Sequence, residues 1–463
     1  MNYSVVIYIL GWIMEIEAAF LALPGIVSAI YGEKGGFAFL WVALGSAVAG
    51  SAIILRKPKN MRFYLREGFV TVALSWILMS VIGCLPFVIN GDIPHFADAL
   101  FEMISGFTTT GATVVSDVEG LTKGSLFWRS FSHWIGGMGV LVFLLAIVPM
   151  AGGSHMNLMK AESPGPSVGK LVPKVRQTAK YLYIIYFALT MIEVIFLLFG
   201  GMNLFEALTT SFGTAGTGGF AIWNDGFVSV SPYNQWVVTI FMLLFGVNFG
   251  FYFLILTGKL RDALKFEEVR IYFIIVIAAA VFIFINLRHF ALYAPAEGIR
   301  QAFFQVASII TTTGFASADF NLWPETSRTI LVLLMFIGAC AGSTGGGIKV
   351  SRFIIACKSF IKEIISYLHP RSVKKIKIEG KPLEHETLRA TNVYFMTYMV
   401  IFAVSVLLVS IENKDLVTNF AAVAATFNNI GPGLSLVGPM ANFGHFTAVS
   451  YTHLRAHETA ANL

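Results

Sequence analysis

The sequence predicts an all-α polytopic membrane protein, and three observations support that fold class. First, 56% of the 463 residues are hydrophobic and only 13% are charged, and the mean hydropathy is +0.74. Soluble domains carry about 25% charged residues, so the composition argues against a water-soluble enzyme. Second, about nine apolar runs approach the ~20 residues that a helix needs to span a bilayer. Third, one pattern of segments recurs four times with a period of about 100 residues.

The apolar runs and the basic connections between them predict how the chain is threaded. The runs cover residues 4–30, 37–55, 69–90, 126–150, 181–201, 235–257, 271–287, 327–341 and 393–411. Three connections, 56–66, 160–180 and 352–389, are rich in Lys and Arg. Because cytoplasmic loops carry an excess of these residues, we expect these connections and the N-terminus on the cytoplasmic side.

The other connections contain the repeated pattern, which is a short apolar helix followed by a Gly/Thr-rich segment. The first and third copies match most closely, with the same offset from Phe101 to Gly111 as from Phe304 to Gly314. The Gly-rich segments of the four copies cover residues 108–113, 213–220, 311–315 and 428–433. We therefore expect four helix–pore-loop–helix repeats that all enter the membrane from the same side.

The chemistry of these segments favours a cation pore. Non-helical backbone at membrane depth is tolerated only where it is buried in protein or lines a water-filled cavity. Glycine turns carbonyl groups toward an axis without a Cβ clash, carbonyl rings replace the hydration shell of an alkali cation, and a short helix aims its negative C-terminal end at the ion. The predicted filter residues are Thr109, Thr110, Gly111, Gly218, Gly219, Thr312, Thr313, Gly314, Asn429, Ile430 and Gly431.

Acidic residues follow three of the four filter glycines. Asp117 and Asp225 stand six positions after Gly111 and Gly219, and Asp319 stands five positions after the third-repeat glycine. Acids at an outer mouth concentrate cations, so the three residues are predicted to line that mouth. The spacing also favours Gly219 as the filter glycine of the second repeat. The alternative is that they are ordinary loop acids.

Other ionisable residues near the apolar runs have two possible roles. Glu102 and Glu206 are expected to open short helices, where a negative charge is favourable. Glu193 and His133 lie within or beside apolar runs. Ionisable groups in a membrane are functional hypotheses by default, and hydrogen bonding between helices is the alternative for both.

Several motifs together identify a family resemblance. They are REGF at 66–69, LPF at 85–87, TTTGAT at 108–113, GGMG at 136–139, PGP at 164–166, QAFFQV at 301–306, AGSTGGG at 341–347 and NNIGPGL at 428–434. With these motifs the chain resembles the membrane subunits of the Trk/Ktr-type bacterial potassium-uptake family, the Trk type in particular. The resemblance implies four pseudo-symmetric helix–pore-loop–helix repeats around a central cation pore, preceded by an N-terminal helix pair.

The resemblance also implies a division of the chain, a function and partners. The segments would be the helix pair at 1–66 and pore repeats at 67–160, 161–260, 261–389 and 390–450. The function would be uptake of K⁺ as the transported ion, with no bound cofactor, across the bacterial cytoplasmic (inner) membrane. The partners would be a second copy in a homodimer, membrane lipid, and a cytosolic nucleotide-binding regulatory subunit of the TrkA type; no nucleic acid is expected.

A Gly-rich break interrupts the second helix of the third repeat. In the family that position forms an intramembrane loop below the filter that gates the pore, and glycine there lowers helix propensity and gives a movable segment. Lys349 either places a positive charge near the cation path or snorkels to the cytoplasmic surface. The predicted gate residues are Gly342, Ser343, Thr344, Gly345, Gly346, Gly347 and Lys349.

The fourth repeat departs from the family pattern at its end. Two N-terminal helices and four two-helix repeats require ten spans, whereas about nine apolar runs are present. The segment after Phe446 is polar and is too short to span. We expect that the last helix of the fourth repeat is missing and that residues 451–463 form a non-native tail.

Two other functions are open to a membrane protein of this kind. An alternating-access cation symporter would be built on inverted repeats with discontinuous helices, whereas the four repeats here are expected to be parallel. A membrane-embedded enzyme would need a clustered acid–base or metal set, which the sequence does not show. Whether transport occurs through a channel or is coupled to protons or sodium is left open by the sequence.

Overall fold

The computed structural model describes residues 1–60, 65–137, 139, 175–369, 375–378 and 381–447. Among these residues, six helices are long and apolar enough to cross a membrane. They confirm the prediction of an all-helical multi-span protein. The one addition is a short antiparallel pair of strands, β1 (Lys377–Ile378) and β2 (Lys381–Pro382).

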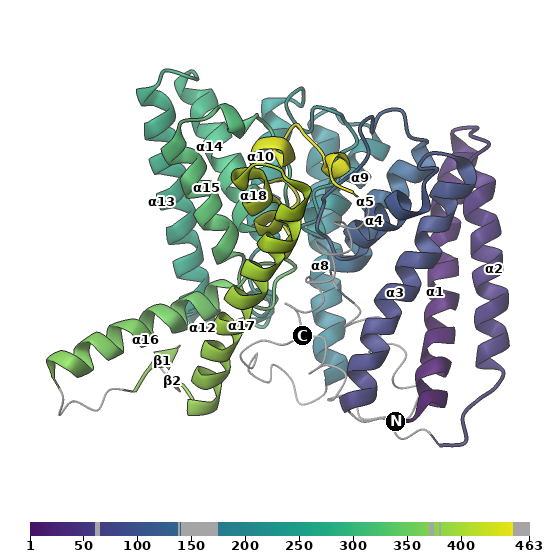
Figure 1. The fold of residues 1–463 in the computed structure, drawn as a ribbon, viewed down its shortest axis with the longest axis horizontal. Coiled ribbons are helices and arrows are strands. Elements are labelled where there is room, and N and C mark those ends of the chain that lie inside the picture. Colours follow the sequence, from purple (N-terminus) through teal and green to yellow (C-terminus); the bar gives the residue numbers. More distant parts are fainter. Residues whose placement is uncertain (61–64, 138, 140–174, 370–374, 379–380, 448–463) are drawn as a thin grey trace.

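Two N-terminal helices, α1 (Tyr3–Ile30) and α2 (Gly36–Ile54), lie side by side at one edge of the molecule (Figure 1). Small residues let the two backbones approach closely, as is common between membrane helices. A Cβ added at Gly50 would stand 2.9 Å from the Gly11 carbonyl oxygen. The Ser46 hydroxyl also donates to the Met14 carbonyl at 2.9 Å.

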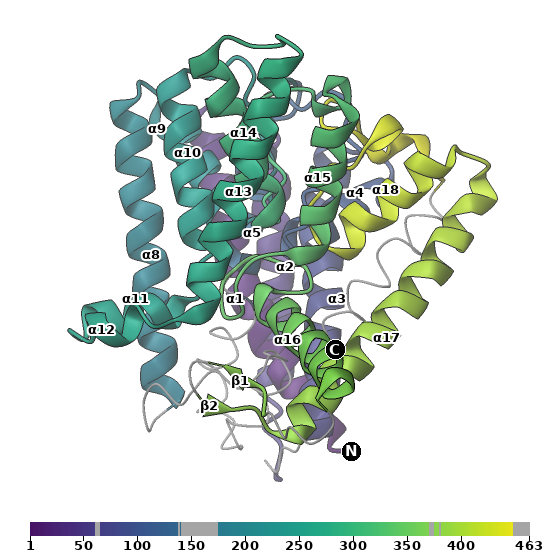
Figure 2. The same cartoon turned by 90° about the vertical axis from the view of Figure 1, so that its left-hand side faces the viewer.

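The rest of the described chain repeats one order of elements, in which a long helix is followed by a short helix and, in the first three repeats, by a second helix. The first repeat has α3 (Leu65–Asn90), α4 (Phe96–Phe107) and α5 (Lys123–Gly137); the second has α8 (Val175–Phe199), α9 (Leu204–Ala215) and α10 (Pro232–Phe245); the third has α13 (Glu267–His289), α14 (Pro295–Ile310) and α15 (Glu325–Ile337); and the fourth has α17 (His385–Val409) and α18 (Leu416–Phe427). The short helices α4, α9, α14 and α18 lie in the same half of the molecule, opposite the N-terminus (Figures 1 and 2). The repeats are therefore parallel, as expected.

Two apolar runs differ from the straight spans that their composition predicts. The run 235–257 is broken into α10 and α11 (Phe249–Leu256), which meet at 89°. The break follows from local capping, because Gly246 ends α10 and the Asn248 side chain accepts from the Gly250 amide at 2.7 Å. The run 327–341 ends as a helix at Ile337, and the chain then forms a loop before α16 (Val350–Leu368).

The remaining described elements are short. They are α12 (Leu260–Ala263) and the 3-10 turns η1 (Phe320–Leu322), η2 (Ser410–Glu412), η3 (Ser435–Val437) and η4 (Phe443–His445). Most of the predicted second half of the run 126–150, most of the basic connection 160–180, and the predicted tail 451–463 lie outside the described residues.

The apolar core follows the repeats. One cluster joins the N-terminal pair to the first repeat, a second fills the second repeat, and the third spans the third and fourth repeats. Each cluster also includes residues of a neighbouring repeat, such as Phe315 in the second and Phe101 in the third. The short helices and the segments after them are thus packed between the repeats rather than exposed.

Candidate functional site

The four short helices end in the same way. In each, a carbonyl in the last turn of the helix accepts a hydrogen bond from the backbone amide five residues further along the chain. This bond turns the chain out of the helix. The bonds run from Thr110 to Ser105 (3.0 Å), from Gly218 to Gly213 (2.9 Å), from Thr313 to Ser308 (2.8 Å) and from Ile430 to Ala425 (2.8 Å). Four chemically different segments therefore adopt one backbone geometry.

The segments after the helices share a second feature, which is a pair of positive φ angles separated by one residue. The pairs are Thr109 (+59°) and Gly111 (+75°), Thr217 (+52°) and Gly219 (+78°), Thr312 (+59°) and Gly314 (+84°), and Asn429 (+63°) and Gly431 (+96°). In the second repeat the glycine at this position is Gly219, which the acid spacing favoured. Thr217 was missed from the sequence, although its position two residues before that glycine was a usable signal.

The four glycines form a closed ring through the carbonyl groups of the neighbouring repeats. A Cβ at Gly111 would meet the Gly218 oxygen, one at Gly219 the Thr313 oxygen, one at Gly314 the Ile430 oxygen, and one at Gly431 the Thr110 oxygen. Each repeat thus presents the carbonyl just before its own glycine to the glycine of another repeat. Because no other residue tolerates this approach at positive φ, the ring accounts for all four glycines.

The outer loops join the repeats into a second ring. The Val118 amide donates to the Asn224 side chain at 2.7 Å, the Phe227 amide to the Ala316 carbonyl at 2.8 Å, the Ser435 amide to the Asn321 side chain at 3.0 Å, and the Phe443 amide to the Thr113 carbonyl at 2.9 Å. These bonds link the first repeat to the second, the second to the third, the third to the fourth, and the fourth to the first. The hydrogen-bonded outer loops therefore form a closed circle around the glycine ring.

The three predicted mouth acids lie in these outer loops and accept local hydrogen bonds. Asp117 accepts from the Asn224 side chain at 2.9 Å and from the Gly120 amide at 3.2 Å. These bonds hold the pKa of the Asp117 carboxyl below its ordinary value. Asp225 accepts from the Ser229 amide at 3.0 Å, and Asp319 caps η1 through the Asn321 amide. Each acid also shapes its own turn.

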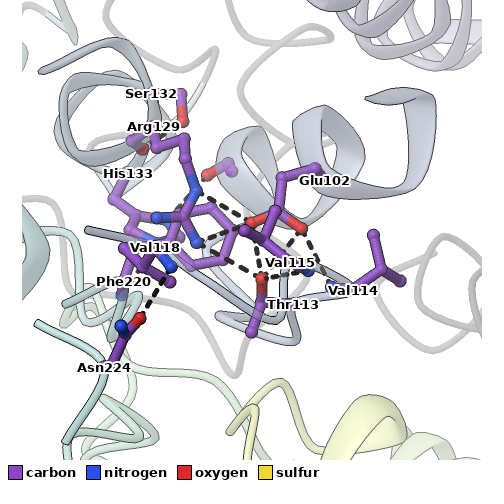
Figure 3. A network of polar contacts seen from close by, with 11 residues as sticks. Glu102, Thr113, Val114, Val115, Val118, Arg129, Ser132, His133, Phe220 and Asn224 are labelled. Carbon is purple, nitrogen blue, oxygen red and sulfur yellow. Dashed lines mark hydrogen bonds and ion pairs between the residues drawn. The ribbon is translucent and has the colours of Figure 1, made fainter. Parts of the chain in front are cut away.

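Glu102 does not open its helix, contrary to the expectation from the sequence. It lies in the middle of α4, is fully buried, and pairs with buried Arg129 of α5 at 2.6 Å (Figure 3). The capping role is correct for Glu206, which forms a reciprocal capping box with Asn203 at the start of α9. The sequence placed Glu102 at the start of its helix because the apolar stretch begins near Phe101, whereas α4 begins at Phe96.

His133 and Glu193 are ionisable residues that the sequence places within or beside apolar runs. The His133 ring is fully buried, and its Nδ1 lies 2.9 Å from the Gly106 carbonyl while its Nε2 accepts from the Phe220 amide at 3.2 Å (Figure 3). His133 thereby joins α4 to the segment after Gly219, which favours the helix-bonding interpretation. Glu193 of α8 is fully buried beside Thr214 of α9.

The Gly-rich segment after α15 lies directly against the third and fourth copies of the ring. The Gly346 amide donates to the Thr312 hydroxyl at 2.5 Å. A Cβ at Gly345 would stand 2.7 Å from the Thr311 carbonyl oxygen, and one at Gly346 would stand 2.8 Å from the Asn429 Cβ. The loop is therefore in contact with the residues that precede the ring glycines, on the side toward α16.

Both ends of this loop are held by one carboxylate that the sequence did not single out. Glu268, at the start of α13, accepts from the Ala341 amide at 2.7 Å and from the Ser351 amide at 2.9 Å. Lys349 has a positive φ of 81°, and its amine donates to the Gly345 carbonyl. Its side chain thus returns into the loop, which does not match the snorkelling alternative.

Comparisons with known proteins agree with this architecture. The family model of TrkH, described as a cation transport protein, matches residues 37–458. The Trk system potassium uptake protein TrkH of Escherichia coli strain K12 is 36% identical over 450 residues, which cover 94% of this chain and 92% of that protein. The protein of the same name from Salmonella typhimurium strain LT2 is 36% identical over 463 residues, with 97% and 94% covered.

A solved structure matches over the whole chain. The crystal structure of the potassium transporter TrkH from Vibrio parahaemolyticus superposes with a TM-score of 0.88 at 31% sequence identity, and the match covers 100% of this chain and 97% of that one. The fold and the family resemblance predicted from the sequence are confirmed, as is the prediction of a transport protein rather than an enzyme. The chain belongs to the TrkH family of cation transport proteins.

Proposed function

We propose that the protein takes up K⁺ across the bacterial cytoplasmic membrane through a filter made of the four segments that meet at the glycine ring. The observation that carries the proposal is the closed ring in which each glycine faces a carbonyl of another repeat. Backbone carbonyls of this kind replace the hydration shell of a weakly held alkali cation. The related proteins from Escherichia coli and Vibrio parahaemolyticus are named for potassium uptake or transport.

The proposed filter comprises the eleven residues predicted from the sequence together with Thr217, which has the same backbone conformation as Thr109, Thr312 and Asn429. The C-terminal ends of the four short helices lie directly before these residues. Helix C-termini carry partial negative charge, so they favour a cation at the ring. Asp117, Asp225 and Asp319 add negative charge in the outer loops.

The loop from Gly342 to Gly347, with Lys349, is proposed as the gate. It is supported by contacts of Gly345 and Gly346 with the third and fourth filter segments and by the hold of Glu268 on both loop ends. A rearrangement of the loop would exchange these bonds together with those at the α10–α11 break, where the Phe249 amide donates to the Gly342 carbonyl at 2.9 Å and the Thr344 hydroxyl donates to the Phe245 carbonyl at 3.3 Å. Glycine at several positions makes such a rearrangement sterically accessible.

The proposed orientation places the N-terminus, α16 and the β1–β2 pair on the cytoplasmic side, because they lie on one face and the connection 352–389 is rich in Lys and Arg. The proposed division of the chain is the one given by the repeats, with the helix pair first. We further propose a homodimer and a cytosolic nucleotide-binding partner, for which the basic cytoplasmic surface is suitable.

Rubidium flux into liposomes, with sodium as competitor, tests the function. We expect uptake that favours rubidium over sodium, because both rubidium and potassium fit a carbonyl ring. In Gly314→Ser, the added side chain at a φ of +84° would collide with the Ile430 carbonyl. This variant should lose most of the discrimination, by about tenfold or more. Unchanged discrimination would refute the filter, and strictly coupled, saturable flux would favour a symporter.

A further inference from the structure

A buried ion pair stands behind the filter at the junction of the first and second repeats. Arg129 of α5 and Glu102 of α4 are 2% and 0% exposed, and two guanidinium nitrogens reach the same carboxylate oxygen at 2.6 and 2.9 Å (Figure 3). Removing two charges from water is costly. A pair at this depth therefore calls for an explanation beyond stability, since apolar residues of similar size would fill the space as well.

The carboxylate of this pair accepts hydrogen bonds from the filter segment of the first repeat. Glu102 accepts from the Thr113 hydroxyl at 2.9 and 3.1 Å and from the Val114 amide at 3.1 Å, so it holds the backbone just beyond Gly111 (Figure 3). Arg129 also donates to the Thr113 hydroxyl at 3.3 Å. Both charged groups thus converge on the same hydroxyl, two residues after the ring glycine.

The guanidinium of the pair contacts the filter segment of the second repeat. It lies 4.1 Å from the centre of the Phe220 ring, a distance at which a cation is attracted to an aromatic face. Phe220 directly follows Gly219. One turn further along α5, His133 binds the Phe220 amide. The pair therefore joins two neighbouring filter segments just beyond their ring glycines.

The third repeat provides an internal comparison. Gln305 stands nine positions before Gly314, as Glu102 stands nine before Gly111. With its amide oxygen turned to the loop, Gln305 accepts from the Ser317 amide at 2.9 Å, which matches the bond from Val114 to Glu102. A neutral side chain is therefore sufficient to hold this backbone. The charge on Glu102 is therefore needed for its ion pair with Arg129. Gln305 is neutral and forms no such pair.

We propose that Glu102 and Arg129 are positioning residues that set the filter geometry between the first and second repeats. The proposal rests on the proposed filter function. The carboxylate fixes the Thr113 hydroxyl and the Val114 amide, the guanidinium fixes Phe220, and the ion pair holds these two contacts in one register. The filter is thus held by charge at this junction, and its discrimination between cations depends on it.

The test compares rubidium-to-sodium flux ratios in liposomes that contain equal amounts of folded protein. Glu102→Gln leaves Arg129 as an unpaired buried charge, so less folded protein is expected. The double variant Glu102→Gln with Arg129→Met removes both charges and should recover folded protein. Its flux ratio should nevertheless stay about tenfold below that of the unmodified protein, because no guanidinium remains to hold Phe220 in register with the first filter segment.

Two milder variants keep the proposal testable if the double variant does not fold. Thr113→Val removes the shared hydroxyl at nearly constant volume, and Phe220→Leu removes the aromatic face and leaves the ion pair intact. Each should lower the flux ratio severalfold, and Thr113→Val should have little further effect when combined with Glu102→Gln. The control is Glu297→Gln, which removes a partly exposed pair with Arg300 at 4.0 Å in α14 and should keep the normal ratio.

The outcomes separate this proposal from the proposed function. If Gly314→Ser loses discrimination while the folded double variant, or both milder variants, keep the normal ratio, the ion pair serves stability alone and the positioning role is refuted. If Gly314→Ser itself keeps the normal ratio, the filter assignment has failed, and the effect of the ion pair on discrimination is refuted with it. Lowered ratios in both sets support both proposals.

Discussion

At the scale of single residues, the proposed filter segments depend on unfavourable backbone conformations that their surroundings compensate. Thr109, Thr217, Thr312 and Asn429 all have φ near +60°. A left-handed conformation costs a non-glycine residue about 1–2 kcal/mol, and residues held this way persist only where other contacts determine them. Here the contacts are the backbone hydrogen bonds at the end of each short helix and side-chain hydrogen bonds, such as the one that the Asn429 amide group donates to the Thr109 carbonyl at 3.2 Å.

Thr312 makes a hydrogen bond between the proposed filter and the proposed gate. Its hydroxyl accepts from the Gly346 amide at 2.5 Å. Thr312→Ala removes this bond, so we expect the loop to leave its present position more often. Flux should rise about fivefold, which corresponds to the ~1 kcal/mol of one hydrogen bond. Flux through liposomes measures it. Thr312→Ser keeps the hydroxyl and is the control; equal flux in the two variants would contradict the link.

Asp117 tests the outer mouth electrostatically. Asp117→Asn should lower cation flux about twofold at low ionic strength and much less at about 0.15 M salt, where exposed charges more than ~8 Å apart are screened. Asp262→Asn removes the same charge in α12, on the opposite side of the molecule, and should not reproduce this salt dependence. Identical flux in Asp117→Asn and the unmodified protein at low salt would remove Asp117 from the mouth.

The pH dependence of the same residue has a defined sign. Because hydrogen bonds from Asn224 and Gly120 lower the pKa of Asp117 in the folded protein, their contribution to stability is present above the ordinary carboxyl pKa of about 3.9. It is lost as the pH falls through the lower folded pKa. The Asp117 charge therefore persists at pH 5, and the salt dependence of flux should be the same at pH 5 and pH 7.

At the scale of elements, the third repeat is distinguished by its broken second helix. Helix α15 ends at Ile337, and Gly338 has a φ of +74°. Gly338 and Gly347 then approach so closely that a Cβ at Gly338 would lie 3.0 Å from the Cα of Gly347. The segment between them forms a loop closed at its base, and α16 leaves it in a different direction from α15 (Figure 2). We therefore expect that a movement of α16 would displace the loop base.

Glu268 determines how firmly that loop is held. Glu268→Ala removes two charge-assisted hydrogen bonds, to the Ala341 and Ser351 amides, each worth about 1.5–3 kcal/mol. We expect the flux to rise tenfold or more in liposomes without any partner protein, because a loss of about 1.4 kcal/mol corresponds to a tenfold change. Glu363→Ala on the exposed surface of α16 is the control. Unchanged or lower flux in a folded Glu268→Ala protein would contradict the expectation that Glu268 holds the proposed gate in a position that limits flux.

At the scale of the whole molecule, the N-terminal pair supports the first repeat without contributing to the glycine ring. Helix α1 contacts α2, α3 and α5. The contacts are close where small residues meet, as at Gly124 of α5, where a Cβ would stand 3.1 Å from the Pro24 carbonyl oxygen. We therefore interpret the pair as a scaffold whose loss would destabilise the first repeat.

Two glycines of α2 test this scaffold role. A Cβ at Gly36 would meet the Ser28 Cβ of α1 at 2.5 Å, whereas Gly45 on the same helix has nothing within 4 Å. Gly36→Leu should therefore destabilise the protein by about 1–3 kcal/mol, the usual cost of overpacking, and lower its thermal unfolding temperature in detergent. Gly45→Leu should unfold normally. The rubidium-to-sodium ratio of folded Gly36→Leu protein should be unchanged; an altered ratio would assign the pair a role in the filter.

Much of the fold was predictable because the bilayer imposes simple rules on a sequence. The long spans and the parallel repeats follow from hydrophobic length and from short-range spacing, such as the match between Phe101–Gly111 and Phe304–Gly314. The breaks in the runs 235–257 and 327–341 did not follow from hydrophobic length. The ring glycines were predictable for the same reason, since only glycine serves at those positions. Thr217 and Asn429 were harder to equate, because the common feature of these positions is a backbone angle rather than a side chain.

The sequence by itself determined the membrane class, the repeats, the family and the position of the ring and of the Gly-rich loop. Only the tertiary structure decided which residues support them. Glu102 with Arg129, His133 with Phe220, and Glu268 with the loop ends are pairs separated by many residues, and nothing in local spacing brings them together. The physical reason is that a buried polar group needs a partner, but packing of distant helices, not the adjacent sequence, chooses which partner it finds.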